Sequence, residues 1–322
     1  MAIKVGFIGS GGIAGYHLSH LEKIKDAQMV GFCDADRSRA EAKAKQFKAK
    51  AYTDYRKMLD ATKPDAVYVC TPPFAHGEYE LDVAARGCHL FVEKPIALSM
   101  DVANQIRDAI AKADVVSAVG YQDRYQDIIA WLRKMLRKHP VATAMGYWMG
   151  GMPGVAWWRV KAQSGGQHTE QTTHIFDMMR HLFGEVKSVF AVGSRGLMAD
   201  VPNYDVEDVS AVTLTFKSGL VGTVYSACCL KGGGKCGIDI FSTDGTFTYI
   251  ERQSVSFRTP SRTEEVRNVA DYGQLSDEAF ITAIRTEGED NKIQSPYADA
   301  CKSLALSLAA DRSMAEGQPV QP

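Results

Sequence analysis

The sequence predicts an α/β protein in which a doubly wound parallel sheet is followed by an α+β domain with a large, mostly antiparallel sheet. Up to about residue 120, short apolar runs alternate with amphipathic, Ala-rich helical segments, a pattern typical of consecutive βαβ units. From about residue 186, apolar and polar residues alternate with a period of two along several short segments. A chain of 322 residues is long enough for two domains, which we place at residues 1–122 and 123–295.

The first domain is expected to contain parallel strands joined by helices. Each expected strand is a short run rich in Val, Ile, Phe or Tyr, and segments 37–47 and 101–113 carry apolar residues at helical spacing. Such alternation predicts a single parallel sheet with helices on its faces. The expected strands are residues 3–8, 29–34, 66–71, 89–93 and 115–120.

The second domain is expected to be an antiparallel sheet with helices against one face. Helices are predicted at 127–138 and 172–182, and Ser218-Gly219 and Asp244-Gly245 stand where hairpin turns would join neighbouring strands. A last helix, 296–315, begins after a Ser-Pro pair and is expected to pack back on the first domain. The expected strands are residues 186–193, 209–217, 220–229, 237–242, 246–251 and 254–258.

Composition and charge argue against several classes of protein. Lys plus Arg (37) nearly balance Asp plus Glu (38), so a net charge of −1 gives no general attraction to nucleic acid or to an anionic membrane. The first residues do not read as a secretory signal, and no segment approaches the ~18 apolar residues of a membrane span. The seven cysteines show no CxxC spacing, which favours reduced thiols in a cytoplasmic protein.

A glycine-rich motif, G-x-G-x-x-A, follows the first expected strand and opens the first expected helix. In a βαβ unit, Gly9 allows the tight turn, Gly11 lets a pyrophosphate approach the backbone, and the small Ala14 lets helix and strand pack closely. The positive end of the helix dipole faces the phosphates, so Gly12 and Ile13 at the helix start are also expected to contact the cofactor. The motif in this context predicts dinucleotide binding.

Asp34 ends the second expected strand, twenty residues after Ala14. A carboxylate at this position accepts hydrogen bonds from the adenosine ribose hydroxyls and repels a 2′-phosphate, so NAD is expected rather than NADP. Arg37 lies close enough in the sequence to reach such a phosphate, which leaves NADP open.

Lys94 lies where open α/β sheets bind their ligands. The segment Glu93-Lys94-Pro95 directly follows an expected strand, at the carboxyl edge of the sheet. A lysine beside a nicotinamide can hydrogen-bond a substrate hydroxyl and stabilise the developing alkoxide. A surface lysine at the end of a strand is an equal alternative on position alone.

A second group of polar residues leads into the helix expected at 172–182. Hydride removal from an alcohol carbon needs a base for the hydroxyl proton, and histidine, with an unperturbed pKa near ~6.5, suits that role. His174 and Asp177 are three positions apart and share a helix face, so a carboxylate could orient His174. A structural role for His174 is an alternative. A metal site formed by His168, Glu170, His174 and Asp177 is disfavoured, because their spacing matches no standard zinc pattern.

Taken together, these segments resemble the glucose-fructose oxidoreductase and inositol dehydrogenase family, Gfo/Idh/MocA, over nearly the whole chain. The resemblance implies an N-terminal Rossmann domain, a C-terminal domain whose open-faced sheet often joins dimers or tetramers, and hydride transfer between a nicotinamide and a sugar or polyol carbon. The motifs that carry it lie at residues 9–14, 71–76 (Thr-Pro-Pro-Phe-Ala-His), 87–95 (ending Glu-Lys-Pro), 158–159 (Trp-Arg), 165–177 and 313–320.

The resemblance also implies roles for particular residues. Lys94 matches the active-site lysine of the family, ahead of a cis proline at Pro95, and His174 matches its general acid/base. Cofactor contacts are implied for two segments that follow strands and for a Trp-Arg pair further along the chain. These residues are Thr71, Pro72, His76, Glu93, Lys94, Trp158 and Arg159.

The sequence departs from the family pattern just before His174. The family has Asp in D-x-G-x-H, whereas this chain has Glu170 and Thr172 at the corresponding positions. We keep Glu170 as a catalytic residue beside Lys94 and His174, although its longer side chain could pair elsewhere. Tryptophan faces suit the apolar faces of sugar rings, although core packing is an equal alternative. The residues expected around the substrate are Lys94, Tyr121, Gln122, Arg124, Trp157, His168, Glu170 and His174.

Three functions are compatible with these residues. The leading one is an NAD(P)-dependent dehydrogenase that acts on a hydroxyl-bearing carbon of a sugar, sugar derivative or polyol. The second is a glycosidase or lyase that retains its NAD and eliminates a leaving group without net oxidation. The third is a non-catalytic nucleotide or sugar sensor, against which the presence of both Lys94 and His174 argues.

Overall fold

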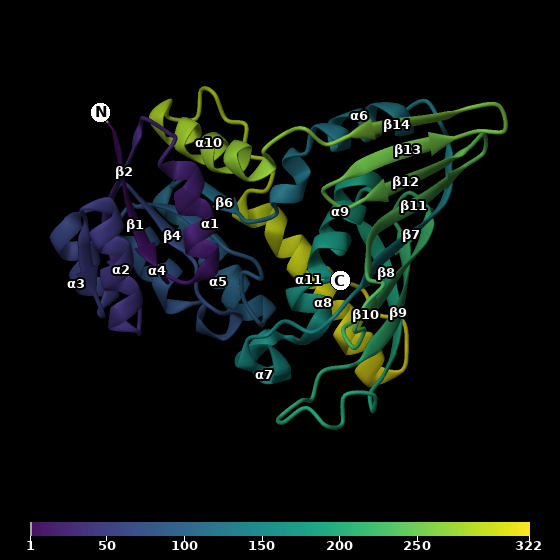
Figure 1. Ribbon diagram of the computed structural model, residues 1–322, viewed down its shortest axis with the longest axis horizontal. Helices are drawn as coiled ribbons and strands as arrows, with labels where there is room; N and C mark the ends of the chain where they lie inside the picture. The colour runs from purple at the N-terminus through teal and green to yellow at the C-terminus, as the bar shows by residue number, and fades with distance from the viewer. Residues whose placement is uncertain (1) are drawn as a thin grey trace. The chain divides into compact units, whose positions relative to one another are not determined.

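A computed structural model describes residues 2–322, which form two compact units (Figure 1). The first unit contains the chain up to Gln122 together with Asp271–Cys301, and the second contains Asp123–Ala270 and Lys302–Pro322. Their sheets are of the two predicted kinds, one parallel and one mostly antiparallel. No helix within residues 2–322 combines the length and the hydrophobicity needed to cross a membrane.

The first unit is built on six parallel strands in the order β3-β2-β1-β4-β5-β6, which is the strand order of dinucleotide-binding doubly wound sheets. β3 was not predicted, because a strand of three residues carries too little periodicity to be distinguished from a loop. The strands are β1 (Ile3–Ile8), β2 (Ala27–Cys33), β3 (Lys50–Tyr52), β4 (Ala66–Val69), β5 (His89–Val92) and β6 (Ser117–Val119).

The core of the first unit is a stack of aromatic rings on the central strands. Phe7 on β1 lies between Phe32 and Tyr68, with ring centroids 5.4 and 5.0 Å away, and Tyr68 stacks on Phe91. Ala14 is fully buried against this core. The helices are α1 (Gly12–Leu21), α2 (Arg37–Phe47), α3 (Tyr55–Thr62), η1 (Pro73–Ala75), α4 (Glu78–Ala85), α5 (Met100–Ala113) and α10 (Tyr272–Arg285).

The second unit is built on eight strands in the order β14-β13-β12-β11-β7-β10-β9-β8. All neighbouring pairs are antiparallel except β7 and β10, which run parallel. The strands are β7 (Val141–Met149), β8 (Val186–Ser194), β9 (Val209–Phe216), β10 (Val221–Ala227), β11 (Lys235–Ser242), β12 (Thr246–Ile250), β13 (Ser254–Arg258) and β14 (Thr263–Arg267).

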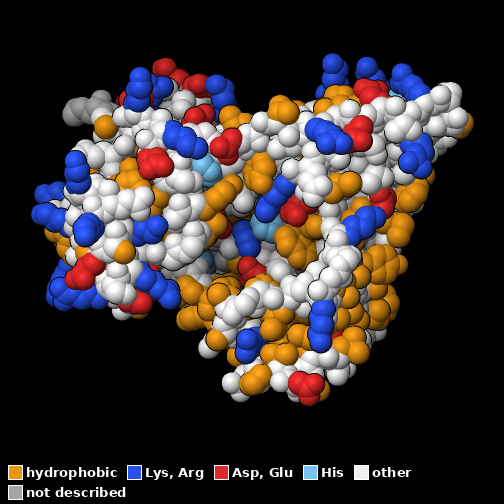
Figure 2. Space-filling view, in the orientation of Figure 1, with side chains coloured by type: hydrophobic (Ala, Val, Ile, Leu, Met, Phe, Trp, Pro, Cys, Tyr) orange, Lys and Arg blue, Asp and Glu red, His pale blue; other side chains and the backbone are white. Residues whose placement is uncertain are grey.

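Helices cover one face of this sheet and leave the other face exposed. Ile129, Phe176 and Leu306 come from three helices and share one buried cluster with the inward residues of the strands. Figure 2 shows hydrophobic side chains gathered on the surface of the second unit. The helices are η2 (Gln122–Tyr125), α6 (Asp127–Leu136), η3 (Ala156–Arg159), α7 (Lys161–Ser164), α8 (Gly166–Glu170), α9 (Thr173–Phe183) and α11 (Tyr297–Glu316).

Two helices near the C-terminus differ from the predicted domain organisation. α10, which was not predicted, belongs to the first unit because Phe280 and Ile281 lie in its core. The final helix was expected to pack on the first domain, but most of α11 belongs to the second unit, because Leu306 and Ala310 are buried in the core of that unit. Hydrophobic periodicity shows that a helix has a buried face without showing which core receives it.

Candidate nucleotide and catalytic site

The glycine-rich turn between β1 and α1 leaves its backbone open where the sequence predicts a pyrophosphate. Gly9 has φ +90°, and a side chain there would collide with the backbone carbonyl of Cys70 at the end of β4. By contrast, a Cβ added to Gly11 or Gly12 would have no heavy atom within 4 Å. Gly9 is therefore required by the fold, whereas Gly11 and Gly12 leave space at the N-terminus of α1 for a ligand to reach the amides.

Asp34 is anchored beside this turn. Its Oδ2 accepts a hydrogen bond of 2.7 Å from the backbone N–H of Ser10, and its Oδ1 accepts one of 2.9 Å from the N–H of Asp36. Arg37 is 80% exposed and its Nε lies 2.7 Å from Oε1 of Glu41, one turn further along α2. The geometry favours Asp34 as the residue that meets a ribose, with Arg37 engaged on its own helix.

Several buried polar atoms around this edge of the sheet fit a bound dinucleotide. Within residues 2–322, the hydroxyl oxygens of Ser10 and Thr71 and the Nε2 of His76 are buried without a hydrogen-bond partner. They follow the carboxyl ends of β1 and β4, where such ligands bind. Because a buried polar atom without a partner is destabilising, these atoms are suited to contacts with a ligand. Nearby in the sequence, Ile13 at the start of α1 and Phe74 in η1 expose apolar surface.

Lys94 lies two residues beyond the end of β5, and its side chain is half-buried. The bond between Lys94 and Pro95 is cis, as the family resemblance implied. The preceding Glu93 is buried, and its Oε2 accepts a hydrogen bond of 3.2 Å from the backbone N–H of Lys94. The lysine is therefore held at a defined point of the sheet edge.

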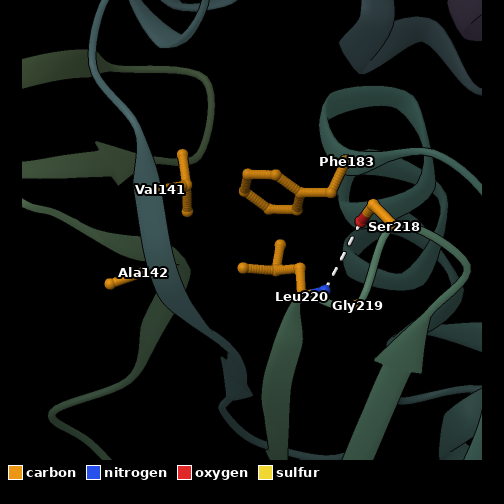
Figure 3. A pocket seen from close by; sticks show the side chains of 6 residues that line it. All are labelled: Val141, Ala142, Phe183, Ser218, Gly219 and Leu220. Carbon is orange, nitrogen blue, oxygen red and sulfur yellow. Dashed lines mark hydrogen bonds between the residues drawn. The ribbon is translucent and has the colours of Figure 1, made fainter.

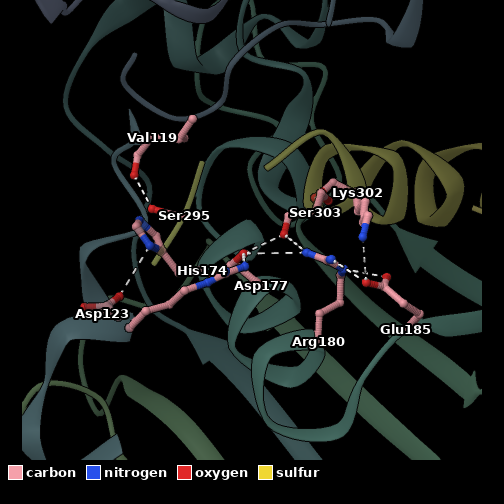
Figure 4. Close-up of polar contacts among 11 residues, drawn as sticks. Val119, Asp123, His174, Asp177, Arg180, Glu185, Ser295, Lys302 and Ser303 are labelled. Carbon is pink, nitrogen blue, oxygen red and sulfur yellow. Dashed lines mark hydrogen bonds and ion pairs between the residues drawn. The ribbon is translucent and has the colours of Figure 1, made fainter. Parts of the chain in front are cut away.

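In the second unit, the imidazole of His174 faces the carboxylate of Asp123, a residue that the sequence analysis did not single out (Figure 4). Nδ1 of His174 lies 3.4 Å from Oδ2 of Asp123, and the Nε of Arg252 donates a hydrogen bond of 2.8 Å to Oδ1. The imidazole stacks on Trp148 of β7, with ring centroids 5.5 Å apart. Burial by itself would raise the pKa of Asp123, but the hydrogen bond to His174 and the charge of Arg252 outweigh it and lower the pKa. An ionised carboxylate facing one ring nitrogen prepares the other for proton transfer.

Asp177, which the sequence predicted as a candidate partner of His174, pairs with Arg124 instead. Arg124 donates hydrogen bonds from Nε to Oδ2 (2.8 Å) and from Nη2 to Oδ1 (2.5 Å), and Ser303 donates to Oδ1 at 2.6 Å (Figure 4). Arg180 extends this network with a bond of 2.7 Å to Ser303. The expectation that Arg124 binds substrate is therefore not supported, because its guanidinium is buried in this ion pair.

Trp158 and Glu170 bind each other. The indole N–H of Trp158 donates a hydrogen bond of 2.7 Å to Oε2 of Glu170, and the ring is fully buried beside Val206 and Cys228. Trp158 is thus a core residue, so the implied cofactor contact finds no support here. Trp157 is half-buried against the same cluster.

His168 has a structural position. Its Nδ1 lies 2.9 Å from Oδ1 of Asp311 on α11, and its Nε2 lies 2.7 Å from the hydroxyl of Ser210 on β9. Because both ring nitrogens are occupied and the side chain is buried, the position of His168 gives no support to the expectation that it binds substrate.

The positions of three further expected site residues, Tyr121, Gln122 and Arg159, do not indicate what each residue would contact. Tyr121 is buried directly after β6, and Gln122, which follows it, is half-buried. Arg159 is half-buried at the end of η3, where its carbonyl accepts a hydrogen bond from the N–H of Asp205. Their positions assign no chemical role.

The second unit has a hollow of about 460 Å³. Figure 3 shows the side chains that line it. It begins at Val141, the first residue of β7, whereas His174 stacks on Trp148 near the other end of that strand. Seven residues of β-strand separate these ends by roughly 23 Å. The hollow is therefore separate from the candidate site. It is lined by Val141, Ala142, Phe183, Ser218, Gly219 and Leu220.

Comparison with protein families gives two consecutive matches. Residues 3–121 match the GFO/IDH/MocA family, described as an oxidoreductase family with an NAD-binding Rossmann fold. Residues 140–248 match the GFO/IDH/MocA C-terminal domain. Together the two matches cover more than half of the chain.

Individual proteins are similar over most of their length. Myo-inositol 2-dehydrogenase of Thermotoga maritima is 27% identical over 331 residues, covering 99% of this chain and 98% of that protein. D-glucoside 3-dehydrogenase of Escherichia coli is 31% identical over 240 residues, covering 67% and 68%. A solved structure of levoglucosan dehydrogenase with NADH and levoglucosan has a TM-score of 0.89 at 21% identity, covering 100% of this chain and 99% of that one, which shows a shared fold.

Proposed function

Because the chain belongs to the Gfo/Idh/MocA oxidoreductase family, we propose that it transfers hydride between NAD and a hydroxyl-bearing carbon of a sugar, sugar derivative or polyol. Membership confirms the predicted family, the NAD-binding Rossmann domain and the oxidoreductase class. Relatives named for inositol and glucoside substrates support the substrate class. The observation that carries the proposal is the Asp123–His174 pair, which has the arrangement of an oriented general base.

The chain's own residues divide the work of this reaction. When bound, NAD would supply the acceptor for the hydride that leaves the substrate carbon. Gly11 and its neighbours hold the pyrophosphate and Asp34 holds the ribose. His174 takes the hydroxyl proton at Nε2 while Asp123 holds Nδ1. The ammonium group of Lys94 stabilises the negative charge that develops on the substrate oxygen.

The dehydrogenase is favoured over the two alternatives. The named relatives include several dehydrogenases that act on polyols and glucosides, which supports net oxidation over a glycosidase or lyase with a retained cofactor. A sensor that binds without turnover needs no proton acceptor, so the Asp123–His174 pair supports catalysis.

The proposal is tested by adding NAD to the purified protein with a panel of cyclic polyols, glucosides and anhydrosugars, and following NADH absorbance. We expect at least one member to reduce NAD with saturation kinetics. Product that forms without added NAD and without net NADH would instead support the redox-neutral alternative. Binding without any turnover across the panel would support the sensor.

The Asp34→Asn variant is expected to lose part of the preference for NAD. The amide keeps an oxygen for the N–H of Ser10 but loses the acceptor for the N–H of Asp36 and removes the negative charge. We therefore expect kcat/KM for NAD to fall roughly 10- to 100-fold while that for NADP falls less. Steady-state kinetics with both cofactors measure this change. Arg37→Ala is the control and should change NAD use little, because Arg37 pairs with Glu41. If Asp34→Asn kept the wild-type preference for NAD over NADP, Asp34 would not be the residue that contacts the ribose and selects the cofactor.

The exposed sheet face of the second unit is proposed to join copies of this chain into a homodimer or homotetramer. Phe190 and Met145 lie in one cross-strand row, through Thr213 of β9 and Thr223 of β10. Val192 is 54% exposed and Tyr225 is 41% exposed. Monomeric proteins rarely leave several large apolar side chains together on an exposed sheet face, which supports burial against an identical face.

Introducing charge into this face is expected to separate the subunits. The double variant Val192→Glu/Tyr225→Glu places carboxylates where the proposed interface would desolvate them. Light scattering coupled to size exclusion should then report a lower mass than for the wild type. Val269→Glu is the matched control, because Val269 is 87% exposed and lies outside the strands. A wild-type protein that is monomeric at micromolar concentration would refute the proposed oligomer.

A further inference from the structure

A chain of buried polar contacts in the first unit runs from α10 through α1 to the residue before Lys94. Nδ1 of His17 on α1 lies 2.8 Å from Oδ1 of Asp277 on α10, and its Nε2 lies 2.9 Å from Oε1 of Glu93. The other carboxylate oxygen of Glu93 accepts the backbone N–H of Lys94 at 3.2 Å. His17, Asp277 and Glu93 have relative exposures of 2%, 0% and 5%, so water does not compete for these contacts.

The imidazole of His17 is the cation between two carboxylates. Burial by itself would lower the pKa of His17, but the charges and hydrogen bonds of Asp277 and Glu93 outweigh it and raise the pKa to about 10. Each ring nitrogen lies within hydrogen-bond distance of a carboxylate oxygen, so both carry protons and each donates to one carboxylate. Tyr68 and His20 also contact Asp277, at 3.0 and 2.8 Å, which anchors the far end of the chain.

Hydrogen bonding explains this cluster better than a metal ion does. His17, His20 and Asp277 are residues of the kinds that bind zinc, and their ligand atoms lie within 4.8 Å of one another. However, the two nitrogen–oxygen distances to Asp277 are 2.8 Å. Two ligands that each lie about 2.0–2.1 Å from a tetrahedral zinc would be roughly 3.3 Å apart. The short distances are those of charged hydrogen bonds.

Glu93 has little freedom apart from this contact. A Cβ added to Gly120, the residue after β6, would collide with the Glu93 carboxylate, so that carboxylate fills the space that a side chain would take. Rotation of the Glu93 side chain would therefore break its contact with His17 and its hydrogen bond from the backbone N–H of Lys94. His17 lies on α1, the helix that begins at the glycine-rich turn. The helix that follows the turn therefore also holds Glu93 in place.

We propose that His17 is a positioning residue for Lys94, acting through Glu93 and linking the placement of the lysine to the helix that follows the nucleotide-binding turn. The inference rests on the proposed function, because Lys94 is the group that the proposed reaction uses. His17 itself touches neither cofactor nor substrate in this role. Its loss should alter where Lys94 is presented rather than whether NAD binds.

The test compares His17→Gln with His20→Gln in the full-length protein. The two histidines lie on the same helix, are similarly buried and contact the same carboxylate, but through different oxygens, and His17 alone of the two bridges to Glu93. One readout is the rate at which acetic anhydride labels Lys94, measured by peptide mass spectrometry against other lysines. The others are NADH affinity and the separate values of kcat and KM.

We expect His17→Gln to change the relative labelling of Lys94 several-fold and to lower kcat on the order of 10- to 100-fold, with NADH affinity within about twofold of wild type. His20→Gln should leave labelling and kcat near wild type even if it lowers the melting temperature as much. If the two variants changed labelling and kcat equally, or if His17→Gln changed neither, the proposal would be overturned. The buried contacts of His17 would then have only a structural role.

A second variant keeps the proposal testable if His17→Gln does not fold. Glu93→Gln retains the size of the side chain but removes the charge that His17 faces, and it should change Lys94 labelling in the same direction. Unchanged labelling in Glu93→Gln would overturn the proposal. Because labelling needs no turnover, it reports on the position of Lys94 even if no sugar or polyol proves to be a substrate, which separates failure of this inference from failure of the proposed reaction.

Discussion

Replacement of Lys94 by Ala is expected to lower kcat by roughly 10²- to 10³-fold while NADH affinity stays close to that of wild type. The ammonium group is proposed to meet a negative charge that exists only as the substrate hydroxyl loses its proton. An interaction that strengthens in the transition state affects kcat more than ground-state binding. The cofactor is held elsewhere, by the turn at Gly9 and by Asp34. Steady-state kinetics and NADH fluorescence titration measure the two quantities separately.

Two further variants sharpen this experiment. Lys94→Met keeps most of the aliphatic stem and removes the charge, so it should be nearly as inactive as Lys94→Ala. Lys112→Ala removes an exposed lysine at the last turn of α5 and should behave as wild type. Normal turnover by Lys94→Met would show that charge at this position is not needed. A parallel loss of NADH affinity would instead make Lys94 a cofactor ligand.

The placement of the glycine-rich turn, Asp34 and Lys94 at one edge of the parallel sheet could be predicted because it depends on features that are local in the sequence. The turn at residues 9–14 adjoins β1, Asp34 directly follows β2, and Lys94 follows β5, so strand order alone brings them to one edge of the sheet. Gly9 shows why the motif is informative: its positive φ and its closeness to Cys70 both require glycine. Each of these features is determined by the residues next to it.

The partners of His174 could not be predicted in the same way. Helical spacing correctly suggests that His174 and Asp177 share a face. It cannot show that Arg124, on a different segment, forms an ion pair with Asp177. Asp123 lies far from His174 in the sequence, and no periodic pattern marks it. The contacts of His168 could not be predicted for the same reason, because Ser210 and Asp311 meet it only in the folded chain.

The central strand β7 was missed for a related physical reason. Its inward residues include Ala144 and Gly146, which give little hydrophobic signal. Gly146 is required because a Cβ there would lie 2.6 Å from a side-chain carbon of Ile175 on α9. A strand that lets a helix approach closely is built from small residues, and small residues resemble a loop in a hydrophobicity pattern.

The Asp123–His174 pair gives the second large expected effect. His174→Asn should lower kcat by roughly 10²- to 10⁴-fold, because it removes the proposed proton acceptor. It should also abolish the rise of kcat/KM with pH that a general base produces in the oxidation direction. Asp123→Asn should lower kcat substantially while keeping that pH dependence, since the imidazole remains but is held less well. The measurement for both variants is the initial rate of NADH formation, followed by absorbance at a series of pH values.

Glu170→Gln compares Asp123 with Glu170, the other carboxylate that the sequence analysis expected to be catalytic. Glu170 accepts the indole N–H of Trp158, and an amide can keep that bond, so its substitution should lower kcat far less than Asp123→Asn. A larger loss in Glu170→Gln than in Asp123→Asn would reverse this ranking and make Glu170 the more important carboxylate for turnover. Equal loss in both would indicate that neither acts through His174 alone.

The depressed pKa of Asp123 also predicts how stability depends on pH. A carboxyl group whose pKa is lower in the folded state contributes stability that is present above its unfolded pKa of about 3.9 and is lost as pH falls through the folded pKa. Asp123→Asn removes this contribution, so the free energy of unfolding should differ most from wild type near neutral pH. The difference should shrink as pH falls below ~4. Urea unfolding at several pH values tests this, and a difference that stays constant down to the lowest pH would show that the Asp123 carboxylate is not stabilised by His174 and Arg252.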